Sequence, residues 1–196
     1  IRDEDNCTPL HIAANAARGY VVAVLVGAGA DVHAVDPSGW TPLHFGSFNN
    51  YCCFNSICIP LLRAGADIKQ KEGLSGWSPL HCAASGNSSK TVALLVQAGA
   101  DLEARDSTHT TPLGFAVRFI SAQAAMILLA CGAETMVGDE GGATPLWLSK
   151  GGPSLAAELL FVRGYTFALW LRENGSRCST FAILGLGHRF DVAKIS

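Results

Sequence analysis

Three histidines recur at the same place in a repeated phrase, and imidazole can act as a general base or a metal ligand near neutral pH. Residues 38–44 read SGWTPLH, residues 75–81 read SGWSPLH, and His11 follows Thr8-Pro9-Leu10 in the same way. A metal site requires ligands that converge on one point, and a general base requires a nucleophile beside it. Stacked repeats hold equivalent atoms a full repeat apart, and no nucleophile recurs near these histidines. We therefore favour a structural role for them, with no catalytic residue and no metal ligand.

Cysteine is the other residue type that could carry chemistry. The seven cysteines form no CxxC pair, their number is odd, and a chain of 196 residues does not depend on a disulfide framework. We interpret them as reduced thiols of an intracellular protein, most simply a cytoplasmic one. The cluster of Cys52, Cys53 and Cys58 is a possible metal or redox-responsive site, but its spacing matches no zinc pattern. We expect no cofactor.

Charge and hydropathy exclude two classes of partner. The 14 basic and 16 acidic residues give a net charge of −2 and form no basic stripe, so we expect no nucleic acid. The longest apolar stretch, residues 155–171, contains Glu158 and Arg163 and is not expected to span a membrane. Charged residues make up only 15% of the chain, against roughly 25% in typical soluble domains. This shortage of charge needs an explanation.

Two sequence markers recur in the same phase along the chain. Thr/Ser-Pro-Leu occurs five times with spacings of 33, 37, 33 and 33 residues, at Thr8, Thr41, Ser78, Thr111 and Thr144. Gly-Ala-Asp/Glu occurs four times, beginning at Gly29, Gly65, Gly99 and Gly132. The first marker leads the second by 21 residues in three copies and by 24 in the other copy. Two markers in one phase predict an array of structural repeats.

Each part of the repeat has a mechanical interpretation. Thr or Ser before Pro predicts a helix start, because the hydroxyl caps free N–H groups and Pro suits the first turn. Apolar segments such as residues 21–26 and 92–96 predict a second helix, and the following Gly suits its C-terminus. A turn precedes each Thr or Ser, with a left-handed position at Asn6, Gly39, Gly76, His109 and Gly142. The unit is turn, helix, loop, helix.

With these motifs the chain resembles the ankyrin repeats, whose signature is T-P-L-H-x-A with a period of about 33 residues. Here the signature stands as TPLHIAA, TPLHFGS, SPLHCAA, TPLGFAV and TPLWLSK. The resemblance implies an all-α solenoid of stacked helix pairs with projecting β-hairpin-like turns. It places one array over residues 1–196, with repeats at about 3–35, 36–72, 73–105, 106–138 and 139–172 and a degenerate capping repeat at 173–196.

The resemblance also implies structural roles. Each motif histidine is expected to bond the Thr or Ser hydroxyl of its own motif and neighbouring backbone. The expected structural residues are Thr8, His11, Thr41, His44, Ser78, His81, Thr111 and Thr144.

The second and fifth repeats depart from the pattern. The second has three extra residues around positions 49–54 and a proline at Pro60, which predicts a short or shifted second helix. One extra residue at positions 72–75 is expected to lengthen the next turn. The fifth repeat contains Gly151-Gly152-Pro153 between its helices and is one residue short.

The resemblance implies that the turn and the end of the first helix face a partner on the concave side. Trp40 and Trp77 lie one residue ahead of the helix cap, where nothing in the repeat requires a large aromatic. The predicted partner-binding residues are Trp40, Phe48, Asn49, Trp77, Ser85, Arg118 and Phe119. An alternative remains open, in which each Trp packs on the neighbouring turn and only stiffens the array.

These observations predict a non-catalytic module that binds a protein partner. The nearly uncharged outer segments, such as residues 20–30, further suggest a subunit or domain of a stable larger complex. One alternative is a recruiting arm of a larger enzyme, such as a ubiquitin-ligase adaptor, with the catalytic part outside residues 1–196. The identity of the partner does not follow from these residues.

Overall fold

The computed structural model describes residues 3–4, 6–49 and 54–145 and contains eight helices in this part of the chain. No strand occurs among these described residues. In chain order the helices are α1 (Pro9–Asn15), α2 (Gly19–Gly27), α3 (Pro42–Phe48), α4 (Phe54–Arg63), α5 (Pro79–Ser85), α6 (Ser89–Gln97), α7 (Pro112–Arg118) and α8 (Ala122–Ala130).

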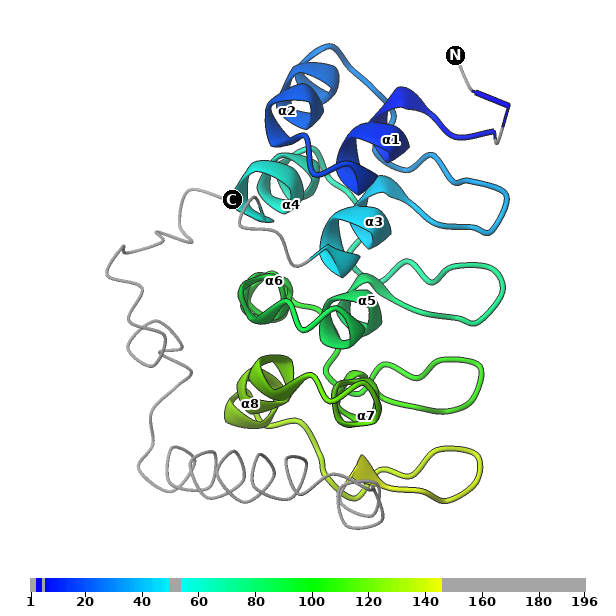
Figure 1. The fold of residues 1–196 in the computed structure, drawn as a ribbon, viewed down its shortest axis with the longest axis vertical. Coiled ribbons are helices and arrows are strands. Elements are labelled where there is room, and N and C mark those ends of the chain that lie inside the picture. Colours follow the sequence, from blue (N-terminus) through cyan, green and yellow to red (C-terminus); the bar gives the residue numbers. More distant parts are fainter. Residues whose placement is uncertain (1–2, 5, 50–53, 146–196) are drawn as a thin grey trace.

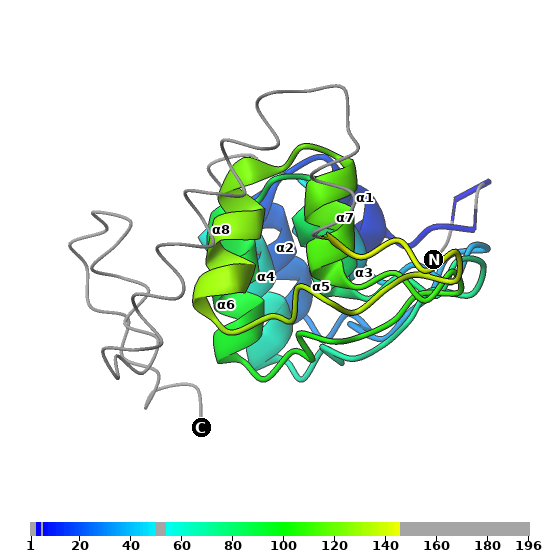
Figure 2. The same cartoon turned by 90° about the horizontal axis from the view of Figure 1, so that it is seen from below.

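The helices form two parallel rows. In Figure 1 the first helices of the repeats, α1, α3, α5 and α7, lie in one row, and α2, α4, α6 and α8 lie in a second row beside it. The connecting turns project from the first row in one direction, away from the second row (Figure 2). Each helix pair packs on the next pair, as expected for a solenoid built from one repeating unit. The fold predicted from the repeat pattern, an all-α solenoid, is confirmed.

The first helix of each described pair begins at the Thr/Ser-Pro motif. Thr8, Thr41, Ser78 and Thr111 are the N-cap residues, in extended backbone conformation, and proline follows each of them. In α1, α3 and α5 the cap is reciprocal, because the histidine three residues later accepts a hydrogen bond from the backbone N–H of the cap residue. This capping box satisfies amides that a helix start otherwise leaves without partners.

The second helices all end in the same way, two residues before a glycine. Gly29, Gly65, Gly99 and Gly132 have φ between 82° and 95°, which glycine adopts without a steric penalty. The alanine after each glycine donates its N–H five residues back, as in Ala30 to the Leu25 carbonyl at 3.0 Å. This Schellman arrangement satisfies the last carbonyls and turns the chain toward the next projecting turn.

A carboxylate organises each projecting turn. The Asp36 side chain accepts from the N–H groups of Ser38 and Trp40, and Asp106 accepts in the same way from Thr108 and Thr110. Neighbouring turns are joined by single backbone hydrogen bonds of 2.8–3.1 Å, from Gly73 to Ser38, Ser107 to Ser75 and Glu140 to Thr108. The expected left-handed positions are confirmed, with φ of 57–84° at Asn6, Gly39, Gly76, His109 and Gly142.

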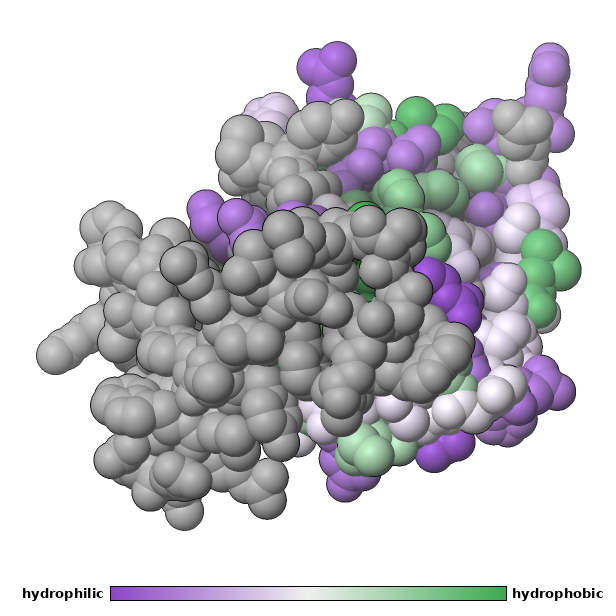
Figure 3. Space-filling model, turned by 60° about the horizontal axis from the view of Figure 1, so that its bottom comes forward, coloured by the Kyte–Doolittle hydropathy of each residue, from purple (hydrophilic) through white to green (hydrophobic). Residues whose placement is uncertain are grey.

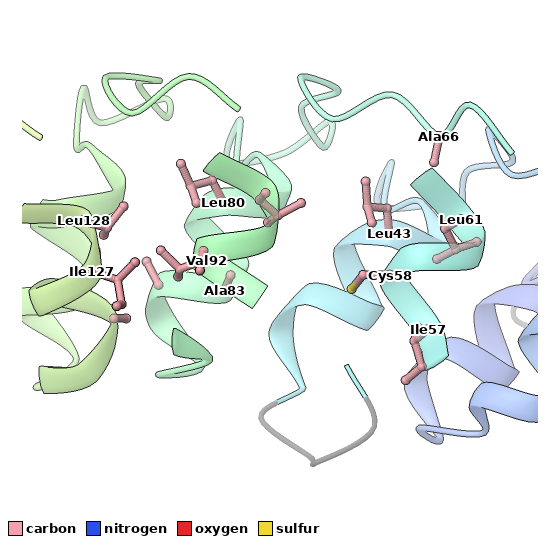
Figure 4. Packing of buried hydrophobic residues seen from close by; sticks show 14 of the residues in the cluster. Leu43, Ile57, Cys58, Leu61, Ala66, Leu80, Ala83, Val92, Ile127 and Leu128 are labelled. Carbon is pink, nitrogen blue, oxygen red and sulfur yellow. The ribbon is translucent and has the colours of Figure 1, made fainter. Parts of the chain in front are cut away.

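The core lies between the two rows of helices. The motif leucines Leu10, Leu43, Leu80 and Leu113 are almost completely buried. Figure 4 shows the second helices supplying side chains that pack against the first row and against adjacent repeats, such as Ile127 beside Val92 and Ala83. The small residues of the first helices, among them Ala14 and Ala84, are also buried. They allow close approach between helices.

The predicted short or shifted helix in the second repeat is wrong. Helix α4 has 10 residues, one more than α2, α6 and α8, and Pro60 lies inside it. It ends two residues before Gly65, in register with the other repeats. The insertion is absorbed by the longer α3–α4 connection and by the one additional residue of α4. Proline removes one helix hydrogen bond. The helix persists because the Ile57 and Leu61 side chains, each about 1% exposed or less, pack in the core.

Some sequence predictions fall outside the described residues. These are Cys52 and Cys53, the fifth repeat beyond Pro145 and the degenerate capping repeat at 173–196. The extent of the array over the whole chain therefore stays a prediction. Within the described part, every helix is too short to traverse a lipid bilayer.

Candidate partner-binding face

The three motif histidines tie adjacent repeats together. In His44, Nδ1 accepts from the Thr41 N–H at 3.2 Å and lies 2.8 Å from the Thr41 hydroxyl, while Nε2 lies 3.0 Å from the Trp77 carbonyl of the next turn. The same pattern joins His11 to Trp40 and His81 to Thr110. Each ring is almost completely buried. The rings lie in separate repeats, so they do not converge on a common ligand.

These contacts define the protonation state of the rings. A carbonyl only accepts, so Nε2 must carry the proton, and an amide N–H only donates, so Nδ1 must be unprotonated. Burial lowers the pKa of His44 and lowers the pKa of His81 to about 4, while hydrogen bonds to the Trp77 and Thr110 carbonyls partly oppose the effect. Both rings are therefore neutral at physiological pH. Neutral, fully engaged imidazoles fit a structural role.

The fourth repeat lacks this tie. Gly114 replaces the histidine, and the Thr111 hydroxyl accepts only from the Gly114 N–H at 3.3 Å. A Cβ atom at Gly114 would lie 2.8 Å from Thr110 Cγ2, so a side chain at this place requires Thr110 to move. In the first three repeats the motif histidine joins the start of the first helix to the next turn. Gly114 has no side chain that could do so.

A continuous row of aromatic rings crosses the face between the projecting turns and the first helices. The Trp40 ring lies 6.4 Å from Phe48 and 6.2 Å from Trp77, measured between ring centroids. Trp77 lies 4.9 Å from Phe115, which lies 5.8 Å from Phe119. We call these five residues the aromatic row. The four aromatics predicted from the sequence are thus brought together, with Phe115 as the link between Trp77 and Phe119.

The turns hold both tryptophans at the backbone. The Trp40 N–H donates to the Asp36 carboxylate at 2.8 Å, and its carbonyl accepts from His11 and from the Asp36 N–H. The Trp77 N–H donates to Glu72 at 3.2 Å, and its carbonyl accepts from His44 and from the Glu72 N–H. Every backbone polar group of the two tryptophans is therefore fixed, and the indole rings have defined positions.

Two roles were considered for the tryptophans, partner anchor and stiffener of the array, and the ring contacts bear on the second. Both rings are half-buried and contact each other across neighbouring turns, as a stiffening role requires. Trp77 also packs against the buried core, whereas Trp40 contacts Phe45 at 5.1 Å and Phe48. At the two ends of the row, Phe48 and Phe119 are 46% and 51% exposed. Phe48 and Phe119 are therefore the most exposed rings of the row by fraction.

Three polar residues of the predicted face differ in availability. The Asn49 amide donates to the Asn15 carbonyl at 2.9 Å and to the Phe45 carbonyl at 3.2 Å, so it joins the ends of α1 and α3. The Ser85 hydroxyl donates to the Cys82 carbonyl at 3.0 Å within α5. Arg118 is exposed, and its guanidinium lies 3.3 Å from the Asp139 carboxylate. Of the three, Arg118 has the most accessible polar group.

The structure adds residues that the sequence analysis did not select. Phe45 and Phe115 occupy the variable position of the T-P-L-H-x-A signature, and their recurrence in two repeats was the available signal. Ile120 is 55% exposed beside Phe119 and has φ of 56°, which a β-branched residue rarely adopts. Leu74, at the lengthened turn, is 77% exposed. Both add exposed apolar surface on elements that carry the predicted face.

The described cysteines form no metal site, and no group of three or more ligands gathers among the described residues. Cys58, the one described member of the predicted cluster, is buried, and burial raises the pKa of its thiol to about 12. Burial also raises the pKa of Cys82 far above its usual range. Thiols held in this state are poor nucleophiles and poor ligands, since both functions require the thiolate.

Comparisons with known proteins agree with the geometry. Sequence models described as ankyrin repeats match residues 10–59 and 50–139. Among curated relatives, a tyrosine-protein kinase, HTK16, from Hydra vulgaris is 30% identical over 118 residues, which are 60% of this chain and 15% of the kinase. Ankyrin repeat and SOCS box protein 3 from Bos taurus is 34% identical over 113 residues, 56% of this chain and 21% of that protein. A B-cell lymphoma 3 protein homolog from Mus musculus is 29% identical over 146 residues, 74% of this chain and 32% of its own length.

The chain thus spans a third or less of these three relatives. The similarity lies in the repeats, whose two matching models together extend over residues 10–139, more than half of the chain. Ankyrin repeats are in general a non-catalytic module for protein–protein interaction. With its capping boxes, imidazole ties, projecting turns and stacked helix pairs, this chain belongs to the ankyrin-repeat family.

Proposed function

We propose that this chain binds a partner protein through the face between the projecting turns and the first helices. The observation that carries the proposal is the aromatic row, which crosses three repeats and ends in the exposed rings of Phe48 and Phe119. Aromatic residues and Arg are the types that most often anchor protein interfaces, and Arg118 adjoins Phe119. A rigid array also binds with little ordering cost, which favours affinity.

The seven predicted residues are expected to contribute unequally. The exposed rings of Phe48 and Phe119 and the half-buried ring of Trp40 supply apolar contacts. Trp77 packs against the buried core and contacts Trp40, so it holds the Trp40 ring in place. Arg118 would receive a carboxylate of the partner, in competition with Asp139. Asn49 and Ser85 would contribute shape more than hydrogen bonds, since their polar groups already bond within the array.

We infer that the array itself plays no catalytic part. The recurring histidines are the side chains whose type and spacing most suggested catalysis, and both ring nitrogens of each one are engaged in hydrogen bonds. A general base must be free to reach a substrate proton. The coarse function, protein binding, is a property of the family, and the face used is our proposal.

Capture of partners from a cell extract tests the proposed face. The variant Phe48→Ser/Phe119→Ser removes two exposed rings and leaves the core intact. The control variant, Tyr20→Ser, removes an exposed aromatic from α2 in the other row, where the side chain is 82% exposed. We expect the double variant to lose at least 90% of the captured partner, while Tyr20→Ser retains it.

Circular dichroism and thermal unfolding must show that both variants remain folded. Full retention of partners by Phe48→Ser/Phe119→Ser would contradict the proposed face. Loss of the same partners in Tyr20→Ser would instead place the binding site on the α2 side.

We also propose that this chain works within a stable larger complex. The support is the low charged fraction of 15% together with exposed apolar side chains such as Tyr20, Leu74 and Met136, which are 82%, 77% and 69% exposed. On the surface visible in Figure 3, apolar residues are interspersed with hydrophilic ones. Sedimentation of the isolated chain at high concentration tests this proposal, and a fully soluble monomer that recovers no partner from extract would count against it.

A second candidate is a recruiting arm within a larger enzyme or enzyme complex, such as a ubiquitin-ligase adaptor. It is favoured by similarity to proteins named as a tyrosine kinase and as SOCS box proteins, of which this chain spans 15–35%. The full-length polypeptide should then carry a further domain, or should bring a bound partner to such an enzyme. Assaying ubiquitin transfer and kinase activity in the purified endogenous complex distinguishes this candidate from a simple binding module.

We place the protein in a reducing intracellular compartment. The support is that Cys58 and Cys82, in the described part of the chain, are buried free thiols. Thiol labelling of the endogenous protein under denaturing conditions tests this placement, since extensive disulfide formation would contradict it.

A further inference from the structure

The amino-terminal end of the array exposes three apolar side chains. Ile12 of α1 and Val21 and Val24 of α2 are 50%, 42% and 51% exposed. We call these three residues the amino-terminal face. Helix α2, Gly19–Gly27, contains no charged residue along its length.

The same three positions are covered in the later repeats. Aligned on the Thr/Ser-Pro-Leu and Gly-Ala-Asp/Glu markers, they correspond to Phe45, Cys82 and Phe115 for Ile12, to Ile57, Thr91 and Ala124 for Val21, and to Pro60, Leu94 and Ile127 for Val24. All nine are buried or half-buried, and six of them are at most 2% exposed. The first repeat therefore differs from the others in exposure while retaining an apolar residue at each position.

Contacts identify what covers these positions. The Phe45 ring lies 5.9 Å from His11 of the preceding repeat, and the Phe115 ring lies 5.1 Å from His81 of the repeat before it. Figure 4 shows Ile127 beside Val92 and Ala83, which also belong to the preceding helix pair. At these three positions the covering group is the helix pair on the amino-terminal side.

The first turn is also built to receive such a neighbour. The Asp3 carboxylate accepts from the Cys7 N–H at 2.7 Å, and the Asp3 N–H donates to the Cys7 carbonyl at 3.0 Å. The corresponding carbonyls in later turns, those of Trp40, Trp77 and Thr110, accept from the histidine of the preceding repeat. The Cys7 carbonyl thus stands where a preceding histidine would bond.

The chemistry of the face argues against a true end of the array. A terminal repeat must meet water, so its outer side carries polar residues in stable solenoids. Ile12, Val21 and Val24 are instead three aliphatic residues. An unrelated partner or a second copy of the chain would not need a histidine acceptor at Cys7 or the register of the internal interfaces.

We propose that the amino-terminal face is an interface for one further helix pair of the same repeat type, supplied by the same polypeptide on its amino-terminal side. The new interface continues the three that join the four described helix pairs. The period predicts a Thr-Pro-Leu-His-like motif about 33 residues before Thr8, since Thr8 and Thr41 are separated by 33 residues. It also predicts Gly-Ala-Asp/Glu shortly before Asp3. A polypeptide whose sequence lacks such a repeat there would overturn the proposal.

A fusion tests whether the face accepts a helix pair. A copy of residues 72–105, which carries the complete SPLH motif, is joined directly to Asp3, so that its Arg105 precedes Asp3 as Arg105 precedes Asp106 in the chain. We expect one cooperative transition with Tm raised by roughly 5 °C or more, and slower amide exchange in α1 and α2. An independent transition of the added repeat, or an unchanged Tm of the array, would overturn the proposal.

A matched substitution shows that the gain comes from this face. Ile12→Lys/Val24→Lys should change the Tm of the unfused chain by no more than about 1 °C, because both side chains are already exposed. In the fusion the same substitutions should abolish the rise in Tm. Sedimentation of the unfused chain provides the last measurement: a dimer that Val24→Lys converts to monomer would identify a second copy as the occupant and overturn the assignment.

Discussion

An imidazole that lies between an amide donor and a carbonyl acceptor can satisfy both groups only in one neutral tautomer. His44 and His81 are held in this way, and each ring connects the start of its own helix to the next turn. Protonation would place an N–H at Nδ1 against the backbone N–H of Thr41 or Ser78. The histidines therefore stabilise the array only while they remain neutral.

This state predicts a loss of stability on acidification. The folded-state pKa of His81 is about 4, below the ordinary value of 6.5, so between these values the unfolded chain binds more protons than the folded chain. The free energy of unfolding then decreases as the pH falls through 6.5 toward 4. His81 alone should account for a loss of about 2 kcal/mol between pH 7 and pH 5, measured by urea unfolding at both values.

The variant His81→Gln should remove most of this pH dependence, because glutamine does not titrate. His33→Gln is the control, since His33 is exposed on a loop. An unchanged pH profile in His81→Gln, or an equal effect of His33→Gln, would contradict the assignment.

Ile120 presents a conflict between stability and surface chemistry. Its φ of 56° is costly for a β-branched residue, by roughly 1–2 kcal/mol. The position two residues after α5 is Asn87, with φ of 51°, which shows a residue type suited to this conformation. We expect Ile120→Asn to raise the free energy of unfolding by about 1 kcal/mol, measured by urea denaturation.

The same substitution should weaken partner capture if Ile120 extends the proposed face at Phe119. Asn87→Ile, which creates the opposite change in the third repeat, should destabilise the chain by at least as much. A destabilising effect of Ile120→Asn would show that the aliphatic side chain contributes packing that outweighs the backbone strain.

In two projecting turns the length of the acidic side chain matches the number of residues in the turn. Asp36 reaches Trp40, four residues on, whereas Glu72 reaches Trp77, five residues on, across the turn that has one extra residue. Glu72 is 5% exposed, and its carboxylate also accepts from the N–H groups of Leu74 and Ser75. The additional methylene group of Glu72 compensates for the additional residue. This match between the Glu72 side chain and the longer turn positions the Trp77 ring.

Shortening the side chain without shortening the turn should therefore be costly. Glu72→Asp should lower the free energy of unfolding by about 1–3 kcal/mol, because buried amides lose their acceptor. Deleting Leu74 in the same variant produces the five-residue form seen at Asp36–Trp40 and should restore most of the loss. Chemical denaturation of the three proteins is the measurement, and a deletion that gives no recovery would contradict this explanation.

Over the whole molecule, the ties between repeats differ in strength. Three turns accept a hydrogen bond from a preceding imidazole, through the carbonyls of Trp40, Trp77 and Thr110. The fifth turn, at Ala143, receives no such bond from position 114, which is glycine. An array with unequal neighbour interactions opens first at its weakest junction.

Native-state amide exchange should reveal this junction. We expect the Ala143 amide to exchange roughly fivefold faster than the Thr110 amide, a difference of about 1 kcal/mol in opening free energy, although both amides donate to an aspartate. Gly114→His combined with Thr110→Ser, which removes the methyl group that obstructs a Cβ at position 114, should slow exchange at Ala143. Equal exchange rates in the original chain would contradict the argument.

Much of this arrangement could be predicted from the sequence because its causes are local. Thr8-Pro9 and its equivalents specify helix starts, and Gly29 and Gly39 specify a helix end and a turn through backbone conformation alone. The error at α4 arose because Pro60 disfavours a helix locally, while burial of Ile57 and Leu61 is a tertiary effect that outweighs it. Of the candidate face, Trp40, Phe48, Trp77 and Phe119 could be selected by their place in the repeat. Phe115 was not selected, because its role depends on its contact with Trp77 of the preceding repeat.

The sequence alone was enough to predict the repeat, its period, the left-handed positions and the fold, because these features depend on residues within one unit of about 33 positions. The structure was needed to show which aromatic rings contact one another, that Asn49 joins two helices, and that Ile12, Val21 and Val24 are exposed. The physical reason is distance along the chain. Contacts between repeats join residues about 30 positions apart, and their geometry is fixed only when neighbouring units stack.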